Sequence, residues 1–143
     1  MKLVRWGEPG AEQAGLVDAS GTLRDLSDTV ADWSWQTLTP ETLAQVAALD
    51  TEDLPELPAD TRLGAPVFRP GKIVGCALTY GKHAAEAGMA PPEEPMFMMT
   101  AASAINGPHD PVMMPRAAPS WIGKPSWLWC SARQGRILRL KMP

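Results

Sequence analysis

The chain has 143 residues, of which 45% are hydrophobic and 20% charged, and its formal net charge is −3. Such values indicate a globular protein with one domain, or a small domain plus part of another. They argue against nucleic acid as the main partner, and no apolar stretch is long enough to span a membrane. Two cysteines, Cys76 and Cys130, are too few and too distant for a disulfide framework or a zinc site. The N-terminus has no apolar core of a signal peptide, so we expect a cytoplasmic protein.

The charge is unevenly distributed along the chain. Positions 1–110 hold every acidic residue, 16 in all, and seven basic ones, which gives −9. Positions 111–143 hold six basic residues and no acidic one, which gives +6. Half of the tryptophans lie close together near the C-terminal end, at positions 121, 127 and 129. A difference this large suggests that the two parts have different origins.

The first half of the chain predicts a small sheet followed by a helix. The segments KLVRW, AGLVD and TLRDL alternate like strands and are separated by turn residues, so residues 1–26 predict an antiparallel meander. A helical turn over residues 27–35, capped by Ser27, follows. Thr39-Pro40-Glu41 begins a clearer helix, because it has a cap residue, a first-position proline and an acid in the first turn. Its apolar stripe would consist of Leu43, Val46, Ala47 and Leu49.

The second half predicts two strands around a short helix. Residues 50–70 carry four prolines and several acids, which indicates a linker or a lining segment. KIVGCAL (72–78) and MFMM (96–99) have strand length, and residues 80–87 predict a helix that Gly88 ends. A turn at 106–108 and a short strand VMM (112–114) complete the pattern. We expect Cys76 and the methionines of these strands, Met96, Met98, Met99, Met113 and Met114, to be core residues.

TYGKHAAEAG, residues 79–88, holds the candidate chemistry. His83 and Glu86 are three residues apart, so a helix places both on one face, where the carboxylate can orient the imidazole as a base toward water. On spacing alone, a solvated pair on a surface helix is the favoured interpretation. His109, in the turn GPHDP, is expected to be exposed.

Residues 70–115, PGKIVGCALTYGKHAAEAGMAPPEEPMFMMTAASAINGPHDPVMMP, resemble the fumarylacetoacetate hydrolase (FAH) family. The family pattern runs like PGKIICIGLNYxxHAxEAGxxxPxEPxxFxKxxSAIxGPxDPVxxP. Residues 1–65, with WGEPG, GLVD and RDLSD, are similar to the small N-terminal domain of a bacterial branch, often labelled ureidoglycolate lyase or 2-hydroxyhepta-2,4-diene-1,7-dioate isomerase. The resemblance implies an α+β chain: an N-terminal domain (1–65), the incomplete start of an FAH-type mixed β-roll (66–116), and an unrelated tail (117–143).

The same resemblance implies the site. His83 and Glu86 match the dyad that activates water or moves a proton, Tyr80 matches the substrate-binding aromatic residue, and residues 81–95 match a lid. The family binds Mg²⁺ or Mn²⁺, which chelates a 2-oxo acid, and ureidoglycolate is a further substrate. The complete enzymes form homodimers.

This chain departs from the family in three places. Thr79 replaces an asparagine and Thr100 replaces a lysine near the pocket. The metal-binding segment, like KxDWExELAVVIGK, is absent, since no acid follows Asp110. We therefore expect this chain to hold no metal ion and to be inactive by itself.

The sequence of the tail suggests a reason for this loss. Residues 120–132, SWIGKPSWLWCSA, can be encoded so that translation from the third base gives LDWEAELAVVFG, the missing motif with both glutamates. A frameshift between about Arg116 and Ser120 explains the lost acids and the clustered tryptophans together. The alternatives are a non-catalytic binding or interaction fragment and an inert pseudogene product.

Overall fold

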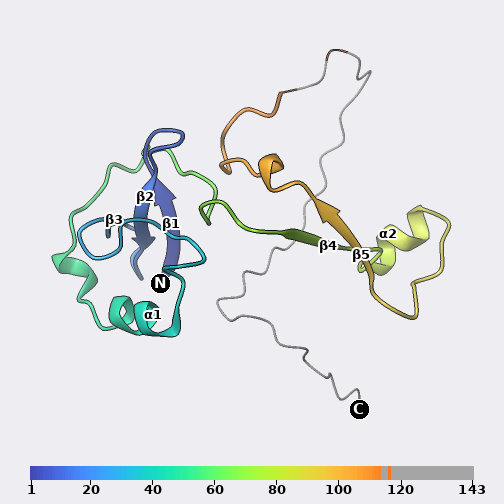
Figure 1. Ribbon diagram of the computed structural model, residues 1–143, viewed down its shortest axis with the longest axis horizontal. Coiled ribbons are helices and arrows are strands. Elements are labelled where there is room, and N and C mark those ends of the chain that lie inside the picture. Colours follow the sequence, from blue (N-terminus) through green and yellow to red (C-terminus); the bar gives the residue numbers. More distant parts are fainter. Residues whose placement is uncertain (114–115, 117–143) are drawn as a thin grey trace. The chain divides into compact units, whose positions relative to one another are not determined.

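The computed structural model describes residues 1–113 and residue 116. It divides into two units, one formed by residues 1–68 with the described residues from Asn106 onward, the other by Arg69–Ile105 (Figure 1). Helices and strands are mixed, which confirms the α+β expectation at that level. The elements are β1 (Lys2–Trp6), β2 (Gln13–Val17), β3 (Leu23–Asp25), α1 (Pro40–Ala47), β4 (Ile73–Ala77), α2 (Gly81–Glu86) and β5 (Met96–Thr100), with 3₁₀ turns at Thr51–Asp53 and Ala102–Ala104.

The expected meander is confirmed as the antiparallel sheet β1-β2-β3 of the first unit. Leu3 pairs with Leu16, and Leu16 in turn pairs with Arg24. Gly15 is required in the central strand, because a Cβ there would lie 2.8 Å from Trp6 Cδ1 and 2.9 Å from the Arg24 carbonyl oxygen. The neighbouring strands therefore pack closely around Gly15 of the middle strand.

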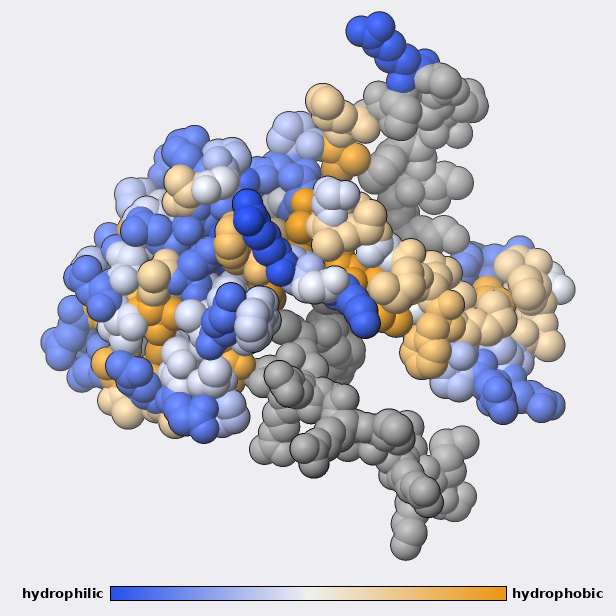
Figure 2. Space-filling model, in the orientation of Figure 1, coloured by the Kyte–Doolittle hydropathy of each residue, from blue (hydrophilic) through white to orange (hydrophobic). Residues whose placement is uncertain are grey.

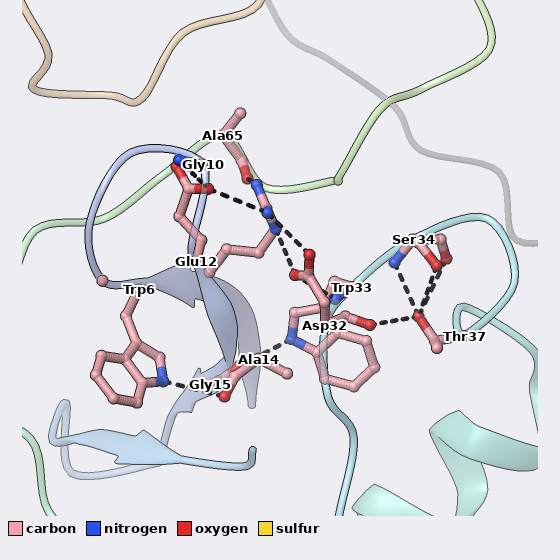
Figure 3. Close-up of polar contacts among 12 residues, drawn as sticks. Trp6, Gly10, Glu12, Ala14, Gly15, Asp32, Trp33, Ser34, Thr37 and Ala65 are labelled. Carbon is pink, nitrogen blue, oxygen red and sulfur yellow. Dashed lines mark hydrogen bonds and ion pairs between the residues drawn. The ribbon is translucent and has the colours of Figure 1, made fainter.

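Trp33 is the centre of the core of the first unit. It is fully buried, and its indole nitrogen donates to the Gly15 carbonyl at 3.0 Å, so the large ring is buried without an unpaired polar group. Figure 3 shows this indole directed at the strand that carries Gly15. The side chains clustered with it are Ala14, Leu16, Leu26, Val30 and Val46.

Helix α1 begins as predicted, but its apolar stripe is narrower. Thr39 Oγ1 accepts a hydrogen bond from the Thr42 amide at 3.2 Å, and Pro40 follows the cap. Val46 is buried, whereas Ala47 is exposed, so the prediction of Ala47 as part of the stripe was wrong. Leu49, just beyond the helix, is partly buried and packs against the core cluster that contains Val46.

The region before α1 consists of turns and does not form a continuous helix. Two isolated hydrogen bonds of helical spacing occur there, from the Val30 amide to the Leu26 carbonyl at 2.8 Å and from the Leu38 amide to the Ser34 carbonyl at 2.9 Å. Asp25, not Ser27, is the capping side chain, because Asp25 Oδ1 accepts from the Ser27 amide at 2.8 Å. The expected turn over residues 27–35 is thus reduced to isolated turns, the first of which has a different cap.

Residues 55–64 line the edges of the three-stranded sheet. The Asp25 amide donates to the Pro55 carbonyl at 2.9 Å on the β3 side, and the Gly64 amide donates to the Arg5 carbonyl at 2.8 Å on the β1 side. Of the two interpretations of this proline-rich stretch, the lining segment is the one observed. It gives the edge strands backbone partners.

The second unit consists of the antiparallel pair β4-β5 and the helix α2. Gly75 faces Met98, and Cys76 faces Phe97 in the register. Every residue of β5 is exposed, and so is Cys76. The expectation that Cys76, Met96, Met98 and Met99 form a core was wrong, because the described residues contain no layer packed over these strands. Met113 is also exposed, residues 112–113 form no strand, and Met114 lies outside the described residues.

The tail, residues 117–143, falls outside the described part of the chain. The expectations about its origin therefore have no structural outcome. Within the described part, no helix combines the length and the apolar character that crossing a membrane requires.

Candidate active site

The candidate site follows β4 in the sequence, after a residue in the left-handed backbone conformation. Leu78 directly follows the strand and has φ +54°, in the left-handed region that non-glycine residues avoid at a cost of about 1–2 kcal/mol. Tyr80 then precedes α2, and Gly88, two residues after the last helical residue Glu86, has φ +67°. The strain at Leu78 lies immediately before the HAAE helix and is the only left-handed non-glycine conformation within 70–105.

The structure places His83 and Glu86 on the same face of α2, as the spacing predicts. His83 Nδ1 lies 4.0 Å from Glu86 Oε2, which is an ion-pair distance if the imidazole is protonated and is longer than a hydrogen bond. The side chains are 39% and 79% exposed. The dyad is assembled in space but open to solvent.

The other residues singled out from the sequence are accessible to solvent. Tyr80 is 47% exposed at the start of α2, and Thr79 beside it is exposed. Thr100 ends β5 opposite Ile73 and is exposed too. His109 is exposed in the turn at 107–110, as expected. The roles proposed for Tyr80, His83 and Glu86 stay predictions.

Chemically, an imidazole beside a carboxylate can take a proton from water and return it to a product. Such a base is most effective when its surroundings exclude bulk water and fix the reacting atom. Residues 81–95, the predicted lid, contain the buried Ala84 but otherwise mostly exposed side chains. The dyad has the chemical groups of a base, and the described residues do not enclose it.

The described residues do not fit a hard divalent cation. They contain no group of three or more His, Cys, Asp or Glu side chains placed to hold a metal ion. The sequence after Asp110 adds no further Asp, Glu or His. Mg²⁺ and Mn²⁺ require several oxygen ligands, and the described residues supply no such set.

A buried charge network in the first unit was not predicted from the sequence. The Arg5 side chain is 4% exposed and binds the Asp32 carboxylate through two hydrogen bonds, at 2.5 and 2.9 Å. It also donates to the Ala65 carbonyl at 3.1 Å and to Glu12 at 3.3 Å, while Phe68 lies under its guanidinium. Figure 3 shows Asp32, Glu12 and Ala65 converging from three segments.

A second arginine extends the network to the residues that follow the second unit. Arg62 donates to Glu12 at 3.1 Å and to both oxygens of Asp110, at 2.8 and 2.6 Å. The hydrogen bonds from Arg62 hold the pKa of Asp110 below its ordinary value of 3.8. Phe68, the last residue before the second unit, is held by a 2.7 Å hydrogen bond from its amide to the Trp33 carbonyl. The first unit therefore fixes the chain on both sides of residues 69–105.

Three related proteins come from Burkholderia species. The chain is 44% identical over 118 residues to a Burkholderia multivorans protein named "Putative hydrolase". It is 42% identical over the same length to proteins of the same description from Burkholderia cenocepacia and Burkholderia ambifaria. No family model matches the chain.

The matched segment covers 82% of this chain but only 42% of each of these relatives. More than half of the length of each relative thus has no counterpart in the match. Identity of this level over 118 residues establishes common descent for the matched segment, while the activity of a complete protein is a separate question.

Proposed function

We propose that this chain is the N-terminal part of an FAH-type hydrolase that acts on a 2-oxo acid or a related small carbonyl compound, and that by itself it is inactive. The observation that carries the proposal is the HAAE pair, His83 and Glu86 at 4.0 Å on one helix face, in a segment related to proteins named as hydrolases. The resemblance of residues 70–115 to the FAH pattern supports the substrate class.

In the proposed reaction, His83 takes a proton from water while the water oxygen bonds to a carbonyl carbon of the substrate. Glu86 orients the imidazole and stabilises its protonated form. The neighbouring C–C bond breaks, its electron pair stays on the 2-oxo acid fragment as an enolate, and the proton held by His83 returns to that fragment. Lyase, isomerase and ureidoglycolate-cleaving activities are alternatives within the proposal, in which His83 would take the proton from the substrate instead of from water and return it to the product.

The metal that the FAH resemblance implies would need ligands that these residues do not provide. We propose that the ligands were encoded by the same gene in another frame, since residues 120–132 can hide LDWEAELAVVFG. Resequencing the coding strand tests this directly: the codons there must spell DWExEL in the shifted frame. Codons that spell no such motif would make the tail native and exclude the frameshift.

The catalytic proposal is tested in the frame-restored protein. We expect His83→Ala and Glu86→Ala each to lower kcat by roughly 10²-fold or more while the far-UV circular dichroism stays unchanged. His109→Ala is the matched control, because His109 is the other histidine of the chain and lies in an exposed turn. Turnover of His83→Ala within a few-fold of the parent protein would contradict the base role and favour a solvated surface pair.

A further inference from the structure

The two-stranded sheet β4-β5 exposes apolar side chains on both of its faces. On one face, Val74 opposite Met99 and Cys76 opposite Phe97 form a continuous apolar square. Val74, Met99 and Phe97 are 50%, 65% and 73% exposed. On the other face, Met96 and Met98 are 44% and 52% exposed. Figure 2 shows the apolar colouring gathered over these strands.

The second unit has almost no interior of its own. Among residues 69–105, all of which the structure describes, Ala84 is the one buried residue. A two-stranded sheet and a six-residue helix are each marginal in water without packing partners. Strands that read as unbroken apolar runs, such as IVGCA and MFMM, are typical of sheets covered on both faces.

The first unit has an interior of its own, so a generally apolar surface is not a property of the whole described chain. Its strands have one buried face, formed around Trp33 and Leu16, and its edge strands pair with residues 55–64. Its one strongly exposed large aromatic residue among the described positions is Trp35, at 68%. Of the eleven strongly exposed large hydrophobic residues in the described part of the chain, five lie on β4-β5, and the other six are Met1, Trp35, Tyr80, Met89, Val112 and Met113. The apolar exposure is therefore densest on β4-β5, in the manner of an interaction surface.

We propose that both faces of β4-β5 are an assembly surface for one polypeptide: the counterpart of the portion of the Burkholderia relatives that the match leaves out. The relatives contain the matched segment within a longer chain, and the match accounts for only 42% of that length. The larger, unmatched portion is long enough to supply further strands along the free edges and layers over both faces. The proposal concerns association and does not depend on the chemistry of His83.

Association is tested with the complete chain, tagged and co-expressed with the unmatched portion of the Burkholderia multivorans protein. We expect an equimolar complex in size-exclusion chromatography with light scattering, and slower amide exchange at residues 73–77 and 96–100. Phe97→Asp should weaken the complex at least 10-fold, because it places a charge on the most exposed part of the surface. Trp35→Asp, the matched control at an equally exposed aromatic residue of the first unit, should leave the affinity unchanged.

Several outcomes would overturn the proposal. These are the absence of a complex, a complex that Phe97→Asp and Trp35→Asp weaken equally, and self-association of the chain alone that blocks the fragment. The last outcome would assign the surface to a second copy of the chain.

If the fragment is insoluble when separate, a single-chain fusion through a flexible linker replaces co-expression. Unprotected amides at 96–100 in that fusion would count against the proposal, and protected ones would support it. His83→Ala should not change association, so failure of the catalytic proposal stays distinguishable.

Discussion

Arg5→Ala should remove a large part of the stability of the first unit. The substitution deletes both hydrogen bonds to Asp32, the bond to the Ala65 carbonyl and the contact with Glu12. Removing one partner of a buried ion pair costs about 3–5 kcal/mol, because the remaining charge stays desolvated. The Asp32 side chain is 24% exposed, which places the expected loss near the lower end, about 3 kcal/mol. A unit of this size is stable by only about 3–10 kcal/mol in total.

The assay is urea denaturation of the complete chain, followed by far-UV circular dichroism and tryptophan fluorescence. Lys2→Ala is the matched control, since it removes an exposed cation from the same strand and should change the midpoint little. A double-mutant cycle with Asp32→Ala isolates the coupling between the two side chains. A loss below about 1 kcal/mol for Arg5→Ala, or simple additivity in the cycle, would refute the reasoning, because those are the values of a solvent-screened surface pair.

Three further predictions concern the packing, the acid sensitivity and the metal affinity of the chain. Gly15→Ala should destabilise the first unit by about 1–3 kcal/mol in the same denaturation assay, since its Cβ meets Trp6 and a backbone carbonyl; Gly71→Ala, with open space around it, is the control, and equal effects would contradict the packing argument. The lowered pKa of Asp110 means that its carboxylate stabilises the fold above pH 3.8 and loses this effect as the pH falls through the folded-state pKa. Asp110→Asn should therefore lower the urea midpoint near neutral pH but not in strong acid, and a pH-independent difference would exclude the ionic contribution. Calorimetric titration of the complete chain with Mg²⁺ or Mn²⁺ should show no stoichiometric micromolar site, and finding one would contradict the ligand count over the described residues.

Features with a local cause were predictable from the sequence. Thr39 caps α1 because its hydroxyl lies three residues from the amide that it accepts, and Pro40 fits the first helical position. The positions of His83 and Glu86 on one face follow from helical geometry alone. Gly88 ends α2 because it adopts a positive φ. In each case the interacting residues lie within a few positions of one another.

Features that depend on distant partners were missed or wrong. Arg5 meets Asp32 across 27 positions, and Arg62 meets Asp110 across 48, so no spacing pattern indicates either pair. The one available signal for Arg5 was its place at an inward position of an alternating strand. Cys76 and Met98 were expected in a core because apolar strands usually have one, yet burial also requires a second layer.

The two units bear differently on the question of catalysis. The first has its own core, a satisfied buried charge network and paired sheet edges, so it can hold the chain rigidly on both sides of residues 69–105. The second carries His83 and Glu86 on a six-residue helix whose side chains are mostly exposed, next to a strained Leu78. A base gains catalytic value when neighbouring layers fix its geometry and exclude water, and the same layers would cover the apolar faces of β4-β5. If both proposals hold, completion of that sheet is the structural step that would turn an open His–Glu pair into an enclosed site.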